Sequence, residues 1–585
     1  MEGLEARFTA ALDLHRRGHV AEAAQIYREL LGVVPGHADV SNLLGLALLH
    51  LGRTDEAGPL LQAAVAAEPS RAAFRLNLAN LLSHSGDQPA ALAQLRCALA
   101  IEPALPEAWF NTAHTCRKLR RLDEAIGGYR RGLAVAPNDA AAQASLGGSL
   151  YEGGQGRAAV SAFRRSLALC REPIANSGYL YVLEFDATTT PETHQRERRR
   201  WAHAHMPAAG TPAEPATRDP DRPITIGFFA PSFDSAAPMM IEPFLRGHDS
   251  RDFRVVLYSG LPAQDDLGRL FARLAERWRT VGGLDDRAFG LAIREDRIDI
   301  LVDTANHIGG HRLQVFAGRH APIQVSGWCH GLGTGTKAFD YVIGDATLIP
   351  EDERRLFVER VFDVPCRTAF PPPTESPPVS PPPVTLGRPF TFGHLGRLSK
   401  VTDETARLWH RLLLRAPGTR LLLKADRETA ALGTRRVVDL LSADIHPGRI
   451  VTIGPKSRFD NMADYANIDL ALDPTPVAGP LTVWESLWMG VPPLVMRGSL
   501  GARPSMSFLT ATGLTHFIAQ DEETYLRVAL DLAQDPRPLL RLRYELRERL
   551  AASEAGNPEH IADAMSRAFR TMWRTYCTPP SPSHP

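Results

Sequence analysis

The sequence has no excess of either charge. Its 66 Lys and Arg residues balance 66 Asp and Glu residues, so the formal net charge is zero. A chain without a net field does not attract nucleic acid or an anionic membrane as a whole, which excludes both as bulk partners. Any basic binding site therefore has to be local.

Cysteine is scarce, and long apolar runs are missing. The cysteines are Cys97, Cys116, Cys170, Cys329, Cys366 and Cys577. Their irregular spacing argues against a disulfide framework or a zinc site, and for reduced thiols. No apolar run reaches the roughly 18 residues that a membrane helix needs, and the first residues lack the apolar segment of a signal peptide. We therefore expect a cytoplasmic protein without a membrane segment.

A repeat of 34 residues occupies the N-terminal third of the chain. Prolines recur at this step at Pro35, Pro69, Pro103 and Pro137, with alanine twelve residues and a large side chain eight residues before each. Two helices joined by a turn and ended by proline satisfy this pattern, which resembles the tetratricopeptide repeat. Four full units and a fifth with a late proline predict an α-solenoid over residues 1–173, in which stacked units bury one continuous core.

Asparagines recur at similar places in successive units, at Asn42, Asn77 and Asn111. We predict that they line the inner face of the solenoid and bind a protein acceptor. An amide both donates and accepts hydrogen bonds, so a ladder of asparagines can hold the backbone of an extended polypeptide of any sequence. The alternative is that the repeats form a homodimer or hold the catalytic part of the same chain.

With 585 residues the chain is too long for a single core, and two to four domains are expected. Residues 174–222 have the composition of a helical connector followed by a proline-rich linker. Strands then alternate with helices over 223–370, a proline-rich linker covers 371–389, and a second alternating series covers 390–578. This alternation predicts two mostly parallel sheets.

Individual elements of the two series can be placed. We expect strands that begin near Ile224, Phe253, Ile298, Tyr341, Phe390, Arg420, Arg449, Ile468 and Pro493, and a helix from Asp265 to Arg279. Two Rossmann-like domains joined by a linker make a cleft, which can hold a donor against an acceptor while it excludes water.

One strand-turn-helix corner has the features of a phosphate site. Ile468–Asp473 is an apolar run that ends in aspartate, a Pro/Gly-rich turn follows, and Thr482 is the expected N-cap of a helix ended by Gly490. Helix N-termini at the carboxyl ends of parallel strands carry free N–H groups and a partial positive charge. We predict that the diphosphate of a sugar nucleotide binds at this corner.

Two cations follow the strand near Phe390. Arg397 and Lys400 stand three residues apart in a glycine-containing loop. Together they can neutralise a pyrophosphate, the guanidinium through forked hydrogen bonds and the ammonium as a point charge. The alternative for an isolated Arg and Lys is a solvated loop.

His307 is the candidate general base. It follows a strand that ends in Asp303, which is expected to orient or tune it. His307 and His311 have the spacing of a metal pair on a helix, but Gly309 and Gly310 between them disfavour a helix, and no metal site is predicted. The alternative is a loop histidine that shapes the acceptor pocket.

The ordered set of motifs resembles the O-linked N-acetylglucosamine transferase and SPINDLY family. The segments that carry the resemblance are the repeats, Asp303-Thr-Ala-Asn-His307, Arg319 to Trp328, Asp340 to Asp345, Arg397-Leu-Ser-Lys400, the Lys456 segment and the corner at 473–492. The resemblance implies an α-solenoid followed by an α/β GT-B fold. It also implies inverting transfer of a sugar from a sugar nucleotide to Ser or Thr of a protein, without a metal or a further cofactor.

The resemblance assigns roles to five donor-site positions. Lys400 matches the family's lysine that contacts the donor diphosphate, whereas Arg397 stands where the animal enzymes have glutamine. Lys456 falls on the loop that reaches the nucleobase through backbone groups. Thr482 is the one hydroxyl kept at the corner, and Glu485 replaces the aspartate that grips the ribose.

The departures from the family pattern cluster where the base, the ribose and the sugar would be recognised. A change of donor would produce this, since bacterial flagellin glycosyltransferases of this architecture use acidic nine-carbon sugars (nonulosonic acids) on a CMP carrier. An acidic sugar would favour an added cation such as Arg397. The rival interpretation is a catalytically degenerate repeat scaffold or adaptor. Lys400 and Glu485 argue against it, because an inactive pocket would have little reason to retain both.

Overall fold

The structure is a computed structural model that describes residues 2–234, 236–328, 332–425, 431–498 and 500–578. Cys329, one of the cysteines considered above, lies outside these residues. The chain divides into two compact units. The first consists mainly of Met1–Gly153, and the second of Gly154–Leu167, Arg171–Arg427 and Gly433–Pro585.

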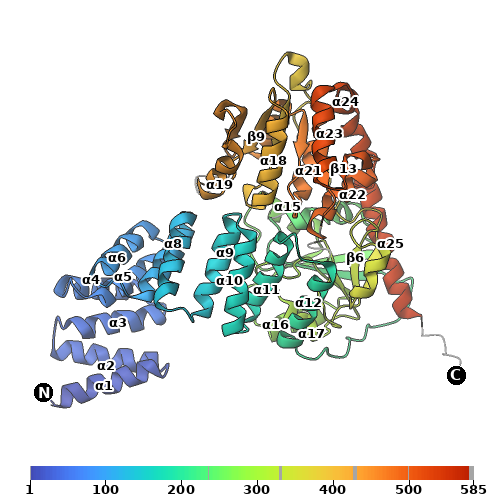
Figure 1. The fold of residues 1–585 in the computed structure, drawn as a ribbon. Coiled ribbons are helices and arrows are strands. Elements are labelled where there is room, and N and C mark those ends of the chain that lie inside the picture. The colour runs from blue at the N-terminus through green and yellow to red at the C-terminus, as the bar shows by residue number, and fades with distance from the viewer. Residues whose placement is uncertain (1, 235, 329–331, 426–430, 499, 579–585) are drawn as a thin grey trace. The chain divides into compact units, whose positions relative to one another are not determined.

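The first unit is a stack of helix pairs. Its helices are α1 (Glu2–Arg16), α2 (Val20–Val33), α3 (Ala38–His50), α4 (Thr54–Ala67), α5 (Ala72–His84), α6 (Gln88–Ile101), α7 (Pro106–Lys118), α8 (Leu122–Val135) and α9 (Ala140–Glu152) (Figure 1). Each repeated proline follows the second helix of a pair. The repeated alanines and large side chains, such as Ala57 and Tyr27, are fully buried. The predicted solenoid is confirmed.

Three helices of the second unit precede its first sheet. They are α10 (Gly156–Leu169), α11 (Pro173–Val182) and α12 (Pro191–His205), with a short 3-10 turn, η1 (Leu183–Phe185), after α11. A Pro at the first position opens both α11 and α12, where its missing N–H costs nothing.

The first sheet has seven parallel strands in the order β3-β2-β1-β4-β5-β6-β7. The strands are β1 (Ile224–Ala230), β2 (Phe253–Ser259), β3 (Arg277–Thr280), β4 (Ile300–Asp303), β5 (Ile323–Ser326), β6 (Tyr341–Gly344) and β7 (Arg360–Asp363). The helices among them are α13 (Ala236–Met239), α14 (Glu242–Gly247), α15 (Asp266–Leu274), α16 (Asp286–Glu295) and α17 (Leu313–Ala317).

The predicted end of one helix beside this sheet is wrong. The helix expected over Asp265–Arg279 is α15, which ends at Leu274, and the residues that follow form the edge strand β3. An edge strand carries charged side chains that a pattern search takes for a polar helix face. Here Arg277 and Arg279 both reach the carboxylate of Asp296.

The second sheet has six parallel strands in the order β10-β9-β8-β11-β12-β13. The strands are β8 (Thr391–His394), β9 (Arg420–Lys424), β10 (Ile450–Ile453), β11 (Leu470–Leu472), β12 (Pro493–Met496) and β13 (Ile518–Ala519). The longer elements around them are α18 (Asp403–Arg415), α19 (Ala431–Ser442), α20 (Arg458–Ala463), α21 (Pro480–Trp488), α22 (Arg503–Ala511), α23 (Glu522–Gln534), α24 (Arg537–Ala551) and α25 (Pro558–Cys577).

Helix α25 returns from the second sheet to the first (Figure 1). Its Phe569 ring packs against Phe228 of β1, Phe244 of α14 and Trp328 after β5. Two parallel sheets with helices around them and a C-terminal helix that crosses back confirm the predicted GT-B fold. No helix in the described ranges is long and apolar enough to cross a membrane.

Candidate active site

The predicted corner lies in the middle of the second sheet, where β11 pairs with both β8 and β12. Helix α21 begins at Pro480 and its N-cap is Gly479, so the prediction that Thr482 caps the helix is wrong. Proline suits the first helical position, and the helix therefore starts before Thr482. The cap is completed by Asp473, whose carboxylate accepts a hydrogen bond from the Gly479 N–H at 3.0 Å.

Lys400 reaches this helix start. It ends the 3-10 turn η4 (Leu398–Lys400) after β8, and its ammonium donates a hydrogen bond to the carbonyl of Ala478. Burial and the charge of Arg397 lower the pKa of Lys400, while Asp473 and Glu184 oppose the shift. Burial raises the pKa of Asp473. An anion that binds at this corner would stabilise the charged form of the Lys400 amine.

Arg397 is exposed three residues before Lys400. Its guanidinium makes no hydrogen bond or ion pair with any residue that the structure describes. All of its donors therefore remain available beside the half-buried Lys400.

Lys456 and Glu485 are each held by an ion-pair partner. The ammonium of Lys456 lies 2.7 Å from Asp464, and Glu485 on α21 accepts a hydrogen bond from Arg458 at 2.8 Å. Burial raises the pKa of Glu485, and Arg458 opposes the shift. Thr482 lies in the first turn of the same helix, where its carbonyl accepts a hydrogen bond from the Tyr465 hydroxyl at 2.8 Å.

His307 lies in the loop after β4 and is only 5 % exposed. The preceding carboxylate, Asp303, accepts hydrogen bonds from the backbone N–H groups of Ala305 and Asn306 at 3.0 and 2.8 Å. Burial raises the pKa of Asp303 to about 7. Both oxygens of Asp303 bond the backbone, so this carboxylate shapes the loop that carries His307.

A hydroxyl from the connector contacts His307. The Ser177 Oγ of α11 lies 3.3 Å from Nδ1 of His307 and 2.9 Å from Nε2 of His311. The Trp201 ring of α12 packs edge-on against His307, with ring centroids 4.6 Å apart. Burial lowers the pKa of His311 to about 4, so this ring is neutral near pH 7.

The two histidines do not form part of a metal cluster in the ranges that the structure covers, where no group of three or more His, Cys, Asp or Glu side chains has metal-binding geometry. Their loop is not helical, as the glycines between them predicted.

A buried ion pair of the connector lies between the two halves of the site. Glu184 and Arg198 are 3.8 Å apart, and both are almost fully buried. Arg198 donates hydrogen bonds to the Asn306 side chain at 3.1 Å and to the Gly333 carbonyl at 3.4 Å. Glu184 also acts electrostatically on Lys400. The connector therefore contributes polar groups to both lobes, which sequence patterns did not indicate.

The asparagines of the first unit bond to one another. Asn77 donates to Asn42 at 3.0 Å, and Asn111 donates to Asn80 at 2.7 Å. Asn42 is buried. Asn80 is a partner that sequence reasoning missed, and part of the hydrogen-bonding capacity of these amides is used within the first unit.

Helix pairs followed by two parallel sheets, with a half-buried lysine at a helix start, define a class: repeat-bearing glycosyltransferases of the GT-B fold. Two family models match the chain, "Tetratricopeptide repeat" over residues 8–72 and "Glycosyl transferase family 41" over residues 389–565. The solved structure of a Thermobaculum terrenum O-GlcNAc transferase mutant is 31% identical, with a TM-score of 0.77, and the match covers 86% of this chain and 98% of that one.

Curated plant proteins are also similar. The Arabidopsis thaliana "Probable UDP-N-acetylglucosamine--peptide N-acetylglucosaminyltransferase SPINDLY" is 34% identical over 375 residues, which cover 63% of this chain and 41% of that protein. The SEC protein of the same plant is 26% identical over 321 residues, which are 53% of this chain and 33% of that protein. This chain belongs to the O-linked N-acetylglucosamine transferase and SPINDLY family of glycosyltransferases. The alignments span about 40% of the SPINDLY proteins' length.

Proposed function

We propose that this chain transfers N-acetylglucosamine from UDP-N-acetylglucosamine to Ser or Thr hydroxyls of a protein that its repeats bind. The observation that carries the proposal is the hydrogen bond from the Lys400 ammonium to the Ala478 carbonyl, immediately before α21. It directs a cation to the helix start, where a diphosphate would also meet free N–H groups. The names of the plant relatives support this donor and a polypeptide acceptor.

In the proposed reaction the acceptor oxygen attacks the anomeric carbon from the side opposite the nucleotide. A new carbon–oxygen bond to Ser or Thr forms as the bond to the diphosphate breaks, and the sugar inverts. Negative charge develops on the leaving diphosphate, and its stabilisation is usually the largest catalytic contribution. Lys400, Arg397 and the start of α21 would supply it in place of a metal ion.

The hydroxyl proton needs an acceptor, and we propose His307. A positioned base typically contributes about a hundredfold or more. The Ser177 hydroxyl lies 3.3 Å from Nδ1 of this ring and helps to hold it in the loop after β4. The alternative role for His307 is to shape the acceptor pocket without taking the proton.

A second donor is favoured by one observation. Arg397 is exposed and has no ion-pair partner among the described residues, so it can pair with the carboxylate of an acidic sugar. A nonulosonic acid on a CMP carrier, transferred to flagellin, would use this cation.

An adaptor without activity is the rival class. It would have no reason to keep an amine buried against the start of α21, where burial lowers its pKa. The position of Lys400 therefore favours an enzyme.

The test combines nucleotide binding with a transfer assay. Thermal shifts with UDP, CDP, CMP and GDP identify the carrier, because a ligand that binds only the native state raises the melting temperature. Intact mass then detects sugar added to a candidate acceptor, flagellin included, from UDP-N-acetylglucosamine or a CMP-linked acidic sugar. We expect a UDP shift and a mass gain that Lys400→Ala abolishes and Lys337→Ala, at an exposed lysine between β5 and β6, preserves.

Three outcomes would contradict the proposal. A mass gain unchanged in Lys400→Ala would remove that residue from the mechanism. A shift and mass gain with the CMP donor alone would transfer the assignment to acidic sugars. Absence of transfer from every donor would favour the adaptor.

A further inference from the structure

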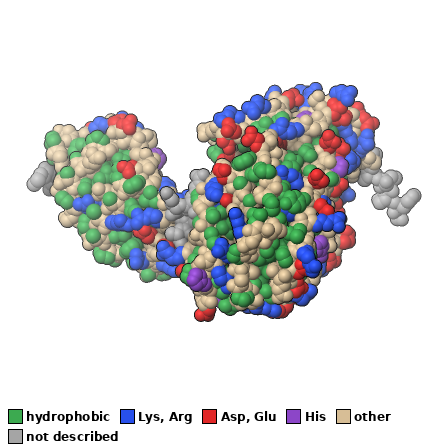
Figure 2. All heavy atoms as spheres, turned by 90° about the horizontal axis from the view of Figure 1, so that it is seen from above, with side chains coloured by type: hydrophobic (Ala, Val, Ile, Leu, Met, Phe, Trp, Pro, Cys, Tyr) green, Lys and Arg blue, Asp and Glu red, His purple; other side chains and the backbone are tan. Residues whose placement is uncertain are grey.

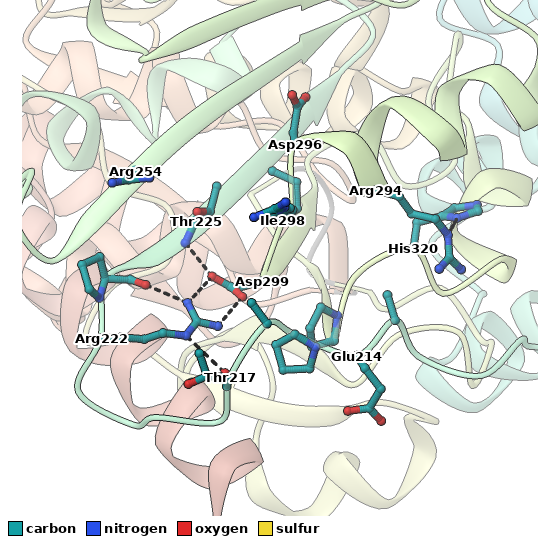
Figure 3. Close-up of a pocket in the computed structure, with 16 residues that line it drawn as sticks. Glu214, Thr217, Arg222, Thr225, Arg254, Arg294, Asp296, Ile298, Asp299 and His320 are labelled. Carbon is teal, nitrogen blue, oxygen red and sulfur yellow. Dashed lines mark hydrogen bonds and ion pairs between the residues drawn. The ribbon is translucent and has the colours of Figure 1, made fainter.

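A cavity of about 580 Å³ lies at the edge of the first sheet that is opposite the candidate active site. It is lined by the starts of neighbouring strands, at Thr225, Arg254, Asp299 and Pro322 (Figure 3). All strands of this sheet run parallel, so the residues that follow their other ends, such as His307, lie at the far edge. Four residues of β4 separate the two edges by about 13 Å.

One wall of the cavity is the segment before β1, and this wall is fixed to the lobe. The Ala213 N–H donates to the Arg319 carbonyl at 2.9 Å, and the Gly210 N–H donates to the Ala317 carbonyl at 2.8 Å. Arg222 forms a two-pronged pair with Asp299 at 2.7 and 2.8 Å, which is visible in Figure 3. The cavity is therefore preformed.

The acidic side chains at the cavity already have cationic partners. Asp299 is paired with Arg222 as described, and Glu214 lies 3.0 Å from Arg218. Asp296 accepts hydrogen bonds from Arg279 at 2.7 Å, and also from Arg277 and the Tyr258 hydroxyl. None of these carboxylates is left to neutralise a further cation.

Three guanidinium groups at the cavity have no carboxylate partner in the described part of the chain: Arg254, Arg294 and Arg297. Arg294 donates to Nδ1 of His320 at 3.1 Å, and burial together with the Arg294 charge lowers the pKa of His320, which keeps this ring neutral. The guanidinium groups of Arg254 and Arg297 make neither a hydrogen bond nor an ion pair with a described residue. The cavity therefore has a local positive excess in a chain whose formal charge is zero.

This excess is not a general property of the surface. On the face drawn in Figure 2, Lys and Arg side chains are interspersed with Asp and Glu side chains. At the cavity, by contrast, cations from β2 and from the end of α16 face one hollow. A concave site with charges of one sign concentrates counter-ions.

We propose that this cavity binds a small phosphate-bearing molecule at a site separate from the donor site. Guanidinium groups bind phosphate oxygens through paired hydrogen bonds, and Arg254 and Arg297 have these donors available. Pro215, Pro223 and Pro322 supply apolar walls for the remainder of the ligand. The volume lies within the range of roughly 300–1,000 Å³ that small-molecule sites occupy.

The test measures binding of inorganic pyrophosphate to the full chain by titration calorimetry at constant ionic strength. Lys400→Ala is the background, because it weakens binding at the donor corner. We expect saturable binding that Arg254→Ala/Arg297→Ala weakens about tenfold or more, since two charge-assisted contacts are lost. The matched control Arg251→Ala/Arg287→Ala removes the same charge from exposed positions of the same lobe, outside the cavity, and should bind as the background does.

Absence of binding in the Lys400→Ala background would overturn the proposal, because pyrophosphate would then bind only at the donor corner. Equal loss in both double variants would also overturn it, since the effect would come from net charge alone. All four arginines are exposed, so melting temperatures equal to that of the background will show that the variants fold. Failure of the transferase proposal would leave this result unchanged, because the readout is binding.

Discussion

The amine of Lys400 lies in surroundings that disfavour its charge. Burial and Arg397 lower its pKa, whereas a bound diphosphate would raise it again. The cation is thus lost at lower pH in the free protein than in the donor complex. The pH dependence of kcat/KM reports the free protein and that of kcat reports the donor complex, so the two profiles should differ.

We predict that kcat/KM falls on the alkaline side at a pH below the usual pKa of lysine, and that kcat falls only at higher pH. Lys400→Arg should remove the alkaline limb of kcat/KM, because a guanidinium does not titrate in this range. Initial rates between about pH 6 and pH 10 measure both profiles. Lys337→Arg is the control, since Lys337 is exposed in the loop between β5 and β6 and has no part in the proposed site. An unchanged limb in Lys400→Arg would refute the assignment.

Ser177 offers a second test at the scale of single residues. We predict that Ser177→Ala lowers kcat by several-fold and costs about 1–3 kcal/mol of unfolding free energy, because a buried and a half-buried imidazole lose a shared partner. The same change in a His307→Ala background should not lower kcat further if Ser177 acts through His307. Ser161→Ala on α10 is the matched control. Additive losses in the double variant would contradict this coupling.

At the scale of elements, helix α21 ends where the sequence predicted. Gly490 has φ 76°, and a Cβ atom there would lie 2.1 Å from the Arg543 carbonyl oxygen. Both the left-handed backbone and the close approach require glycine.

We predict that Gly490→Ala lowers the free energy of unfolding of the second unit by about 3 kcal/mol or more. Gly513→Ala is the matched control, since Gly513 has φ 70° with open space around its Cα, and should cost only about 1 kcal/mol. Urea titration monitored by tryptophan fluorescence compares the two. Equal costs would show that the contact with Arg543 is relieved by a small shift.

The strands were the most predictable elements. Buried parallel strands are continuous apolar runs, and Arg420–Lys424 is β9 with the predicted ends. Errors arose where local chemistry competes with pattern. The charged edge strand at Arg277 resembles a helix face, and Pro480 starts α21 before the threonine that looked like its cap.

The site was predictable only where its residues follow neighbouring strands. Lys400 and the α21 start come together because β8 pairs with β11, which alternating patterns anticipate. Ser177 is 130 residues from His307, and no local pattern encodes that contact. The same holds for Glu184, Arg198 and the arginines of the cavity, whose roles depend on long-range packing.

At the scale of the whole molecule, the chain forms two compact units with separate cores. We predict two calorimetric transitions. UDP should stabilise only the second unit, whose free energy of unfolding rises by about 2.7 kcal/mol at a UDP concentration of a hundred times its Kd. Leu61→Ala, in the buried core of the first unit, should lower the other transition. A single transition that responds to both changes would contradict independent unfolding.

Because α25 returns to the first sheet, folding of the first lobe depends on synthesis of the second. Phe569 completes the aromatic packing around Phe228, and the Trp573 indole donates to the Asp219 carbonyl, 354 residues earlier in the chain. A nascent polypeptide that has produced only the first lobe therefore leaves part of that lobe's apolar surface uncovered. The ribosome must translate the whole second lobe before α25 can cover this surface, and in this interval the growing chain is open to aggregation through it.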